Sequence, residues 1–140
     1  MKERMKAIVH GMLILVAASY AYWYFRDLPW TSTRVVGLAL VIPAFLLWMV
    51  ARIQLGSAFA VRAKAKELFT HGLYSKIRNP IYFFGSIFIT GFFLLIGKPI
   101  WLLILVVLVP MQVIRARKEA KVLEEKFGDL YRDYRSKTWF

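Results

Sequence analysis

Cysteine is absent from the chain, and histidine occurs only twice, as His10 and His71. Without cysteine there can be no disulfide, no thiolate nucleophile and no zinc-thiolate site. The two histidines have no nearby carboxylates at metal-ligand spacing, so we expect no metal. Acidic residues are also scarce, with 8 Asp and Glu against 20 Lys and Arg, which gives a net charge of +12.

Apolar residues are abundant instead. They make up 59% of the 140 residues, and the mean hydropathy is +0.53, which is typical of a membrane protein and leaves room for one compact domain, 1–140. Hydropathy predicts an all-α membrane protein with about four transmembrane helices. The predicted spans are 7–25, 35–51, 81–96 and 100–114.

The last two spans are short for a hydrocarbon core that needs about 20 helical residues. We therefore expect a tight helical hairpin that turns at 97–99, with antiparallel arms whose ends extend into the flanking polar residues. The glycines of this region, Gly85, Gly91 and Gly97, are expected to be packing positions.

Basic residues predict the orientation. Three lie in the N-terminal segment, six in the loop 52–80 and eight in the tail from Arg115, whereas the other two loops hold only three. Both termini and the long loop should therefore be cytoplasmic. This asymmetry and attraction to anionic headgroups account for most of the net charge, so we expect a lipid bilayer as partner and no nucleic acid.

The first span also has features of a cleavable signal peptide, since a basic start precedes an apolar run and small residues. The aromatic residues that follow favour a different interpretation. Tyrosine and tryptophan concentrate at membrane interfaces, so we expect the aromatic cluster within 20–30 to anchor the outer end of a retained helix.

The loop 52–80 is the most polar, turn-rich segment between apolar ones. We expect a short basic helix over 58–68, a turn at 70–72, and a new helix that starts at Asn79-Pro80. Asparagine favours the N-cap and proline the first helical position. The start of this helix should also offer free N–H groups to a ligand carboxylate or phosphate.

The tail is expected to form one amphipathic C-terminal helix with an apolar stripe. Continued backward at helical spacing, the stripe reaches Glu119 and Arg115, so both should face inward, whereas Glu125 should face outward. An ion pair between Arg115 and Glu119 explains the same spacing equally well. Glu124 and Glu125 are expected on a solvated face. The stripe comprises Leu123, Phe127, Leu130, Tyr131 and Tyr134.

Several motifs occur in a characteristic order over about 52–140. His71-Gly72-Leu73-Tyr74 precedes Arg78-Asn79-Pro80-Ile81-Tyr82, and after the apolar hairpin come Arg115, Glu119 and the segment 127–134. In this order they resemble the isoprenylcysteine carboxyl methyltransferase and phospholipid methyltransferase superfamily. The resemblance implies an integral membrane enzyme that uses S-adenosyl-L-methionine, releases S-adenosyl-L-homocysteine and has no Rossmann domain.

Matched by position, the resemblance also implies site residues. Arg115 would bind the substrate, a lipophilic or small-molecule methyl acceptor. The cofactor site would lie in the cytoplasm-facing loop and tail, and no residue is assigned a catalytic role. The cofactor-binding residues would be Leu68, Phe69, Tyr74, Asn79, Pro80, Tyr82 and Glu119.

Two positions depart from the family pattern. Asn79 stands where the family usually has histidine, and Ala120 replaces the second glutamate of a pair. Asparagine cannot act as an acid or base near neutral pH. Because of these departures, the alternative of a non-catalytic scaffold that binds lipid or a partner protein stays open. A small transporter fits less well, since no charged residue lies inside a span.

Overall fold

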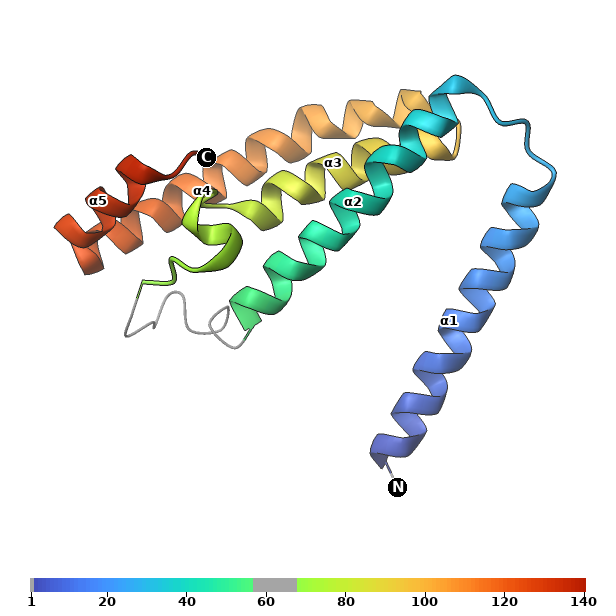
Figure 1. Cartoon of the computed structure of the whole chain (residues 1–140), viewed down its shortest axis with the longest axis horizontal. Coiled ribbons are helices and arrows are strands. Elements are labelled where there is room, and N and C mark those ends of the chain that lie inside the picture. Colours follow the sequence, from blue (N-terminus) through green and yellow to red (C-terminus); the bar gives the residue numbers. More distant parts are fainter. Residues whose placement is uncertain (1, 57–67) are drawn as a thin grey trace. The chain divides into compact units, whose positions relative to one another are not determined.

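The computed structural model describes residues 2–56 and 68–140 (Figure 1). The chain forms two compact units, 1–31 and 32–140. Over the described residues the regular secondary structure is helical, and one isolated bridge joins Ile77 and Trp139. The prediction of an all-α protein is confirmed, whereas the prediction of one domain for the whole chain stays a prediction.

The first unit contains one helix, α1 (Lys2–Arg26). The aromatic side chains near its end contact each other: Tyr20 stacks on Tyr24 with ring centroids 6.4 Å apart, and Tyr24 meets Phe25 edge-on at 5.2 Å. Tyr22 and Trp23 are exposed within this unit. The role of these aromatic residues as a membrane anchor stays a prediction.

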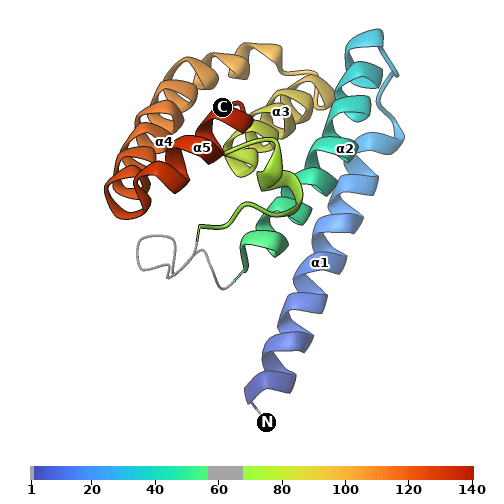
Figure 2. The same ribbon diagram turned by 60° about the vertical axis from the view of Figure 1, so that its left-hand side comes forward.

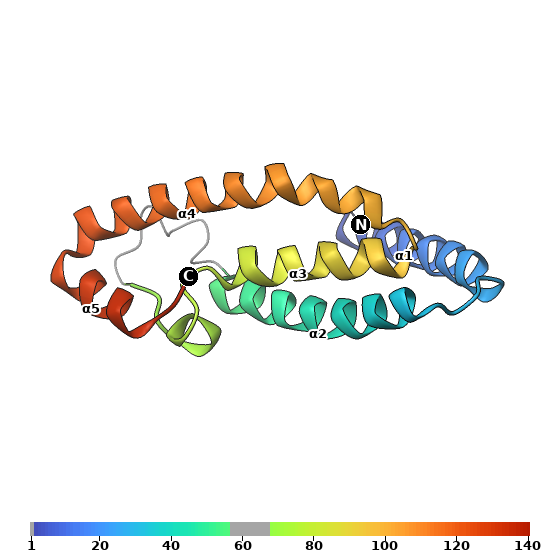
Figure 3. The ribbon, with the colours of Figure 1, turned by 90° about the horizontal axis from the view of Figure 1, so that it is seen from above.

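In the second unit, α2 (Ser32–Leu55) and α3 (Pro80–Leu95) lie side by side along most of their length (Figures 1 and 3). Glycine allows their close approach. A Cβ atom at Gly91 would lie 2.8 Å from the Val41 nitrogen and 2.9 Å from the Gly37 oxygen. Small residues at such contacts let helix backbones pack tightly in a membrane.

The predicted turn after α3 is confirmed. Gly97 adopts a positive φ of 70°, which glycine tolerates without steric cost, and η3 (Pro99–Ile104) leads into α4 (Leu105–Phe127). As expected, α4 continues from its apolar half into the polar residues. However, α3 packs closely on α2 and only sparsely on α4, so the two arms of the predicted hairpin make few contacts with each other.

Two described helical segments are long and apolar enough to cross a membrane by length and composition, Ser32–Leu55 and Pro99–Phe127, and Pro80–Leu95 is a shorter apolar helix. Only 17% of the apolar window in α2 and 6% of that in the second segment is buried within the protein. Such exposed apolar faces are typical of helices that contact lipid or another apolar partner. The predicted number of four spans stays a prediction.

The tail is not one helix, because α4 ends at Phe127 and α5 (Asp129–Lys137) follows after Gly128. Gly128 has φ 52° and ψ −121°, a conformation that side chains with a Cβ rarely adopt. The chain therefore reverses, and α5 lies against the end of α4 (Figure 2). Leu123, Tyr131 and Tyr134 are buried together, but Leu130, placed on the predicted stripe, is exposed.

The loop before α3 contains a short turn, η2 (Gly72–Ser75), close to the turn predicted at 70–72. Tyr74 is buried with Ala51 and Leu55 from the end of α2. The predicted basic helix over 58–68 lies outside the described residues except for Leu68, which is not helical.

Candidate functional site

A hydrogen bond joins Tyr82 and Glu119, two predicted site residues that belong to different sequence motifs. The Tyr82 hydroxyl, in the first turn of α3, donates to Glu119 Oε1 of α4 at 2.7 Å. Both side chains are half-buried. A carboxylate that accepts a hydroxyl hydrogen bond makes a short, charge-assisted contact, so the two motifs meet at one point between the helices.

Arg115 lies one turn before Glu119 on α4 but is exposed, so the prediction that it faces inward is wrong. The buried face of this helix passes through Ala116 and Leu123, and Arg115 points about 100° away from Ala116 around the axis. Among the described residues, no ion pair joins Arg115 to Glu119. Glu119 faces α3, and Glu125 is exposed, as predicted.

Tyr74 and Phe69 form the buried part of the loop. Their rings meet edge-on with centroids 5.2 Å apart. The Tyr74 carbonyl accepts a 2.6 Å hydrogen bond from the Tyr134 hydroxyl of α5, and the Tyr74 hydroxyl donates to the Ala51 carbonyl at 3.4 Å. The loop is thus fixed between the end of α2 and α5.

Asn79 and Pro80 occupy the N-cap and first position of α3, as predicted, but the Asn79 side chain makes no capping hydrogen bond. The Asn79 N–H donates to the Phe140 carbonyl at 2.9 Å, and the Asn79 carbonyl accepts from the N–H groups of Tyr82 and Phe83. These donors are already used within the chain. These three N–H groups are not available to a ligand, and the prediction that the start of α3 binds a carboxylate or phosphate stays a prediction.

The segment around Trp139 pairs with the residues just before α3, and the bond from Asn79 N–H to Phe140 is part of this pairing. Trp139 N–H donates to the Lys76 carbonyl at 3.0 Å, and Arg78 N–H donates to the Trp139 carbonyl at 3.1 Å. The Trp139 ring also meets Phe83 edge-on at 4.9 Å. This β-type pairing was not predicted, because three residues are too few to show the alternation of apolar and polar side chains that marks a strand.

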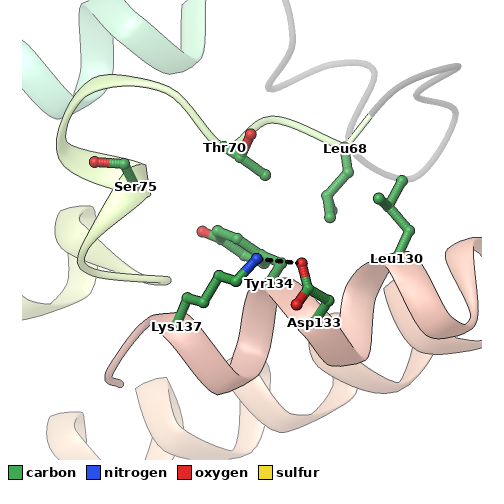
Figure 4. A pocket seen from close by; sticks show the side chains of 7 residues that line it. All are labelled: Leu68, Thr70, Ser75, Leu130, Asp133, Tyr134 and Lys137. Atoms are coloured by element: carbon green, nitrogen blue, oxygen red, sulfur yellow. Dashed lines mark hydrogen bonds and ion pairs between the residues drawn. The ribbon is translucent and has the colours of Figure 1, made fainter.

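A pocket of about 330 Å³ lies between the loop and α5 (Figure 4). Leu68 and Tyr134 contribute to its wall, and the Lys137 ammonium bonds Asp133 at 2.6 Å on its α5 side. Of the predicted cofactor residues, only Leu68 lines this pocket. Its lining residues are Leu68, Thr70, Ser75, Leu130, Asp133, Tyr134 and Lys137.

A second hydrogen bond between α3 and α4 was missed by the sequence analysis. Ser86 Oγ donates to Gln112 Oε1 at 2.9 Å, one turn beyond Tyr82 on α3. The available signal was a single glutamine in the apolar run 105–114. Polar side chains inside membrane segments commonly bond across helices or mark a functional position.

Glu124 is half-exposed and makes contacts that were not predicted. Its carboxylate accepts from Arg132 Nε at 2.9 Å, and Arg135 lies 3.8 Å away, so it links α4 to α5. The hydrogen bond to Glu124, followed by the charge of Asp129, raises the pKa of Arg132 above its usual value. Over residues 2–56 and 68–140, no group of three His, Cys, Asp or Glu residues can hold a metal ion.

Comparison with known proteins gives one family. Neither the search of curated proteins nor that of solved structures found a match. A family model described as "Phospholipid methyltransferase" matches residues 32–130. The match begins where the second compact unit begins, and it includes both helices of the Tyr82–Glu119 contact. The chain therefore belongs to the phospholipid methyltransferase family, whose members are generally membrane methyltransferases.

Proposed function

We propose that this protein is an integral membrane methyltransferase that transfers a methyl group from S-adenosyl-L-methionine to a lipophilic or small acceptor. The observation that carries the proposal is the hydrogen bond from Tyr82 to Glu119. It brings together the two motifs on which the family resemblance rests, although 37 positions separate them in sequence.

The residues present suit a cationic, amphipathic cofactor. Glu119 is a half-buried carboxylate at the junction of α3 and α4, and a carboxylate in such surroundings attracts a cationic group more strongly than in water. Bound there, S-adenosyl-L-methionine would supply an electrophilic methyl group. Tyr82 would hold the Glu119 carboxylate in position, while Phe69 and Tyr74 would provide an apolar, aromatic wall in the loop.

Methyl transfer of this kind needs alignment and exclusion of water more than a covalent intermediate. The chain offers no dedicated base at the predicted site, because Asn79 stands where the family usually has histidine. An amine acceptor must lose a proton, whereas a carboxylate or thiolate acceptor need not. We therefore favour an acceptor that already carries a negative charge.

The site would face the cytoplasm, since Lys76 and Arg78 lie in the loop before α3 and three further basic residues lie in α5, and cytoplasmic segments carry an excess of Lys and Arg. The acceptor would enter from the bilayer. The apolar faces of α2 and α4 that the protein leaves exposed support such access from lipid.

The proposal is tested by calorimetric titration of S-adenosyl-L-methionine and S-adenosyl-L-homocysteine into the purified protein in detergent. In Glu119→Gln the amide oxygen still accepts from Tyr82, but the charge is lost. A hydrogen bond to a charged group contributes about 1.5–3 kcal/mol, so we expect binding of S-adenosyl-L-methionine to weaken by roughly 10- to 100-fold.

Glu125→Gln is the matched control, because it removes the same charge from an exposed position of the same helix. Its affinity should equal that of the unmodified protein. Equal loss in both variants would show a general charge effect and refute the site. Absence of binding to either nucleoside by folded protein would instead favour the alternative function.

That alternative is a non-catalytic membrane protein that binds lipid or a partner protein. The specific observation in its favour is that the Asn79 N–H already bonds Phe140 within the chain, in addition to the missing histidine. Asn79→His separates the two functions, since a gain in methyl transfer would mean that the departure had weakened an existing activity.

A further inference from the structure

Residues 138–140, which we call the strap, lie along the loop that leads into α3. Ile77 and Trp139 form a parallel bridge, and three backbone hydrogen bonds of 2.9–3.1 Å join 139–140 to 76–79. The match to the family model ends at residue 130. Neither the family nor the proposed function therefore assigns a role to the strap.

The strap is anchored in α5. The Thr138 hydroxyl donates to the Tyr134 carbonyl at 2.9 Å, and the Tyr134 hydroxyl donates to the Tyr74 carbonyl at 2.6 Å. Both tyrosines are buried. The strap thus begins at a fixed point, and the loop is held by α5 at Tyr74 and by the strap at Asn79.

The strap also contacts the first turn of α3, which contains Tyr82. The Trp139 ring meets the Phe83 ring edge-on, with centroids 4.9 Å apart. The Asn79 N–H donates to the Phe140 carbonyl, and the Asn79 carbonyl accepts from the Tyr82 N–H. Because of these contacts, a displacement of Trp139 would move the backbone at Tyr82.

The position of Tyr82 matters because its hydroxyl lies 2.7 Å from Glu119 Oε1, and hydrogen bonds weaken steeply when their geometry departs from a narrow range. Trp139 itself contributes little buried area. Its side chain is 53% exposed, and it belongs neither to the buried cluster around Tyr74 nor to that around Tyr134. The contact with Phe83 therefore suits alignment more than stability of the core.

We propose that Trp139 is a positioning residue, which holds Tyr82 opposite Glu119 through the strap and through its ring contact with Phe83. This inference rests on the proposed function and deepens it. The strap, α5 and the loop form one support, and that support fixes the carboxylate that binds the cofactor.

The test combines two measurements on the purified protein in detergent. Nuclear magnetic resonance of tyrosine labelled with ¹³C at Cζ gives the Tyr82 signal, assigned by its disappearance in Tyr82→Phe, and calorimetry gives the affinity for S-adenosyl-L-methionine. Trp139→Ala should shift the Tyr82 signal and weaken binding by about twofold to tenfold, as expected for one aromatic pair. Trp139→Phe keeps a ring beside Phe83 and should restore most of both.

Trp101→Ala is the matched control. Trp101 is similarly exposed, at 59%, and also stacks on a phenylalanine of α3, Phe93, at 6.4 Å, but it lies in η3, beyond the other end of α3. This variant should leave the Tyr82 signal and the affinity unchanged. Equal changes in both variants, a loss of affinity without a shift of the Tyr82 signal, or unfolding of Trp139→Ala would overturn the inference.

A double-mutant cycle tests whether Trp139 acts through Tyr82. In the Tyr82→Phe background, Trp139→Ala should cause little further loss of affinity, because the hydrogen bond that it disturbs is already absent. Independent losses that multiply would mean that Trp139 affects binding in another way, and would refute a role in positioning Tyr82.

The two measurements also separate this inference from the proposed function. If S-adenosyl-L-methionine binds but Trp139→Ala changes neither the Tyr82 signal nor the affinity, only the role of Trp139 fails. If the Tyr82 signal shifts as expected but the nucleoside does not bind the unmodified protein, Trp139 positions Tyr82 and the methyltransferase proposal fails.

Discussion

The two faces of α3 are packed in opposite ways. Toward α2, Gly91 lets the backbones approach so closely that an added Cβ would lie within 3 Å of Val41 and Gly37 atoms. Toward α4, contacts are sparse and include hydrogen bonds made by Tyr82 and Ser86. The close face provides rigidity, while the open face carries half-buried polar groups. Binding sites need both, because a ligand requires space beside a fixed support.

The largest effect is expected on the close face. Gly91→Leu inserts a side chain where even a Cβ would meet backbone atoms at 2.8 Å, and overpacking typically costs about 1–3 kcal/mol, or more where backbone must move. We expect loss of most folded protein, measured by thermal unfolding and size-exclusion chromatography in detergent.

Gly85→Ala and Gly91→Ala provide the matched comparison within α3. A Cβ at Gly85 would lie 3.7 Å from Trp48 atoms, an ordinary contact. Gly85→Ala should therefore keep or slightly raise thermal stability, since alanine favours helix by about 1 kcal/mol over glycine. Both glycines face α2, so if Gly91→Ala were equally harmless, the close approach of the two backbones at Gly91 would not restrict the side chain there.

An intermediate effect is expected on the open face. Tyr82→Phe removes only the hydroxyl that bonds Glu119, and one hydrogen bond contributes about 1 kcal/mol. We expect a modest fall in thermal stability and a clearer loss, about threefold to tenfold, in affinity for S-adenosyl-L-methionine. Calorimetry measures the affinity, and an unchanged value would exclude Tyr82 as a positioning residue.

The smallest effect is expected at the exposed junction of α4 and α5. Arg132→Ala removes ion pairs with Glu124 and Asp129, but exposed pairs contribute little and are screened by salt. The midpoint of thermal unfolding should change slightly at low salt and not at all near 0.5 M salt, where screening is strong. A large change that persists in salt would mean that this junction supports the fold.

Several features of the fold could be predicted because they depend on neighbouring residues. Runs of apolar residues predicted α2, α3 and the start of α4. Gly97 and Pro99 predicted the turn between α3 and α4. The break at Gly128 was missed because the helical spacing of the apolar stripe continues through Leu130. In the structure α5 reverses direction after Gly128, and Leu130 is exposed. A single periodic pattern can span two helices when only one glycine separates them.

The candidate site was predicted only in part. Glu119 and Tyr82 were selected by motif, and the structure brings them into contact, but their roles stay predictions. Arg115 was expected inward and is exposed, because a few tens of degrees around α4 decide which side chain meets α3. Leu68 lines a pocket beside α5, apart from the Tyr82–Glu119 contact.

The sequence by itself determined that this is a helical membrane protein with a polar loop and a basic tail, since hydropathy, charge and turn residues act locally along the chain. Only the tertiary structure decided which helix faces are shared: that α3 packs closely on α2, that Tyr82 meets Glu119, and that Ser86 meets Gln112. The physical reason is that contacts between helices depend on how whole helices rotate and how closely they approach. The local sequence pattern is compatible with several such arrangements, and one glycine or one hydrogen bond between helices can favour one of them.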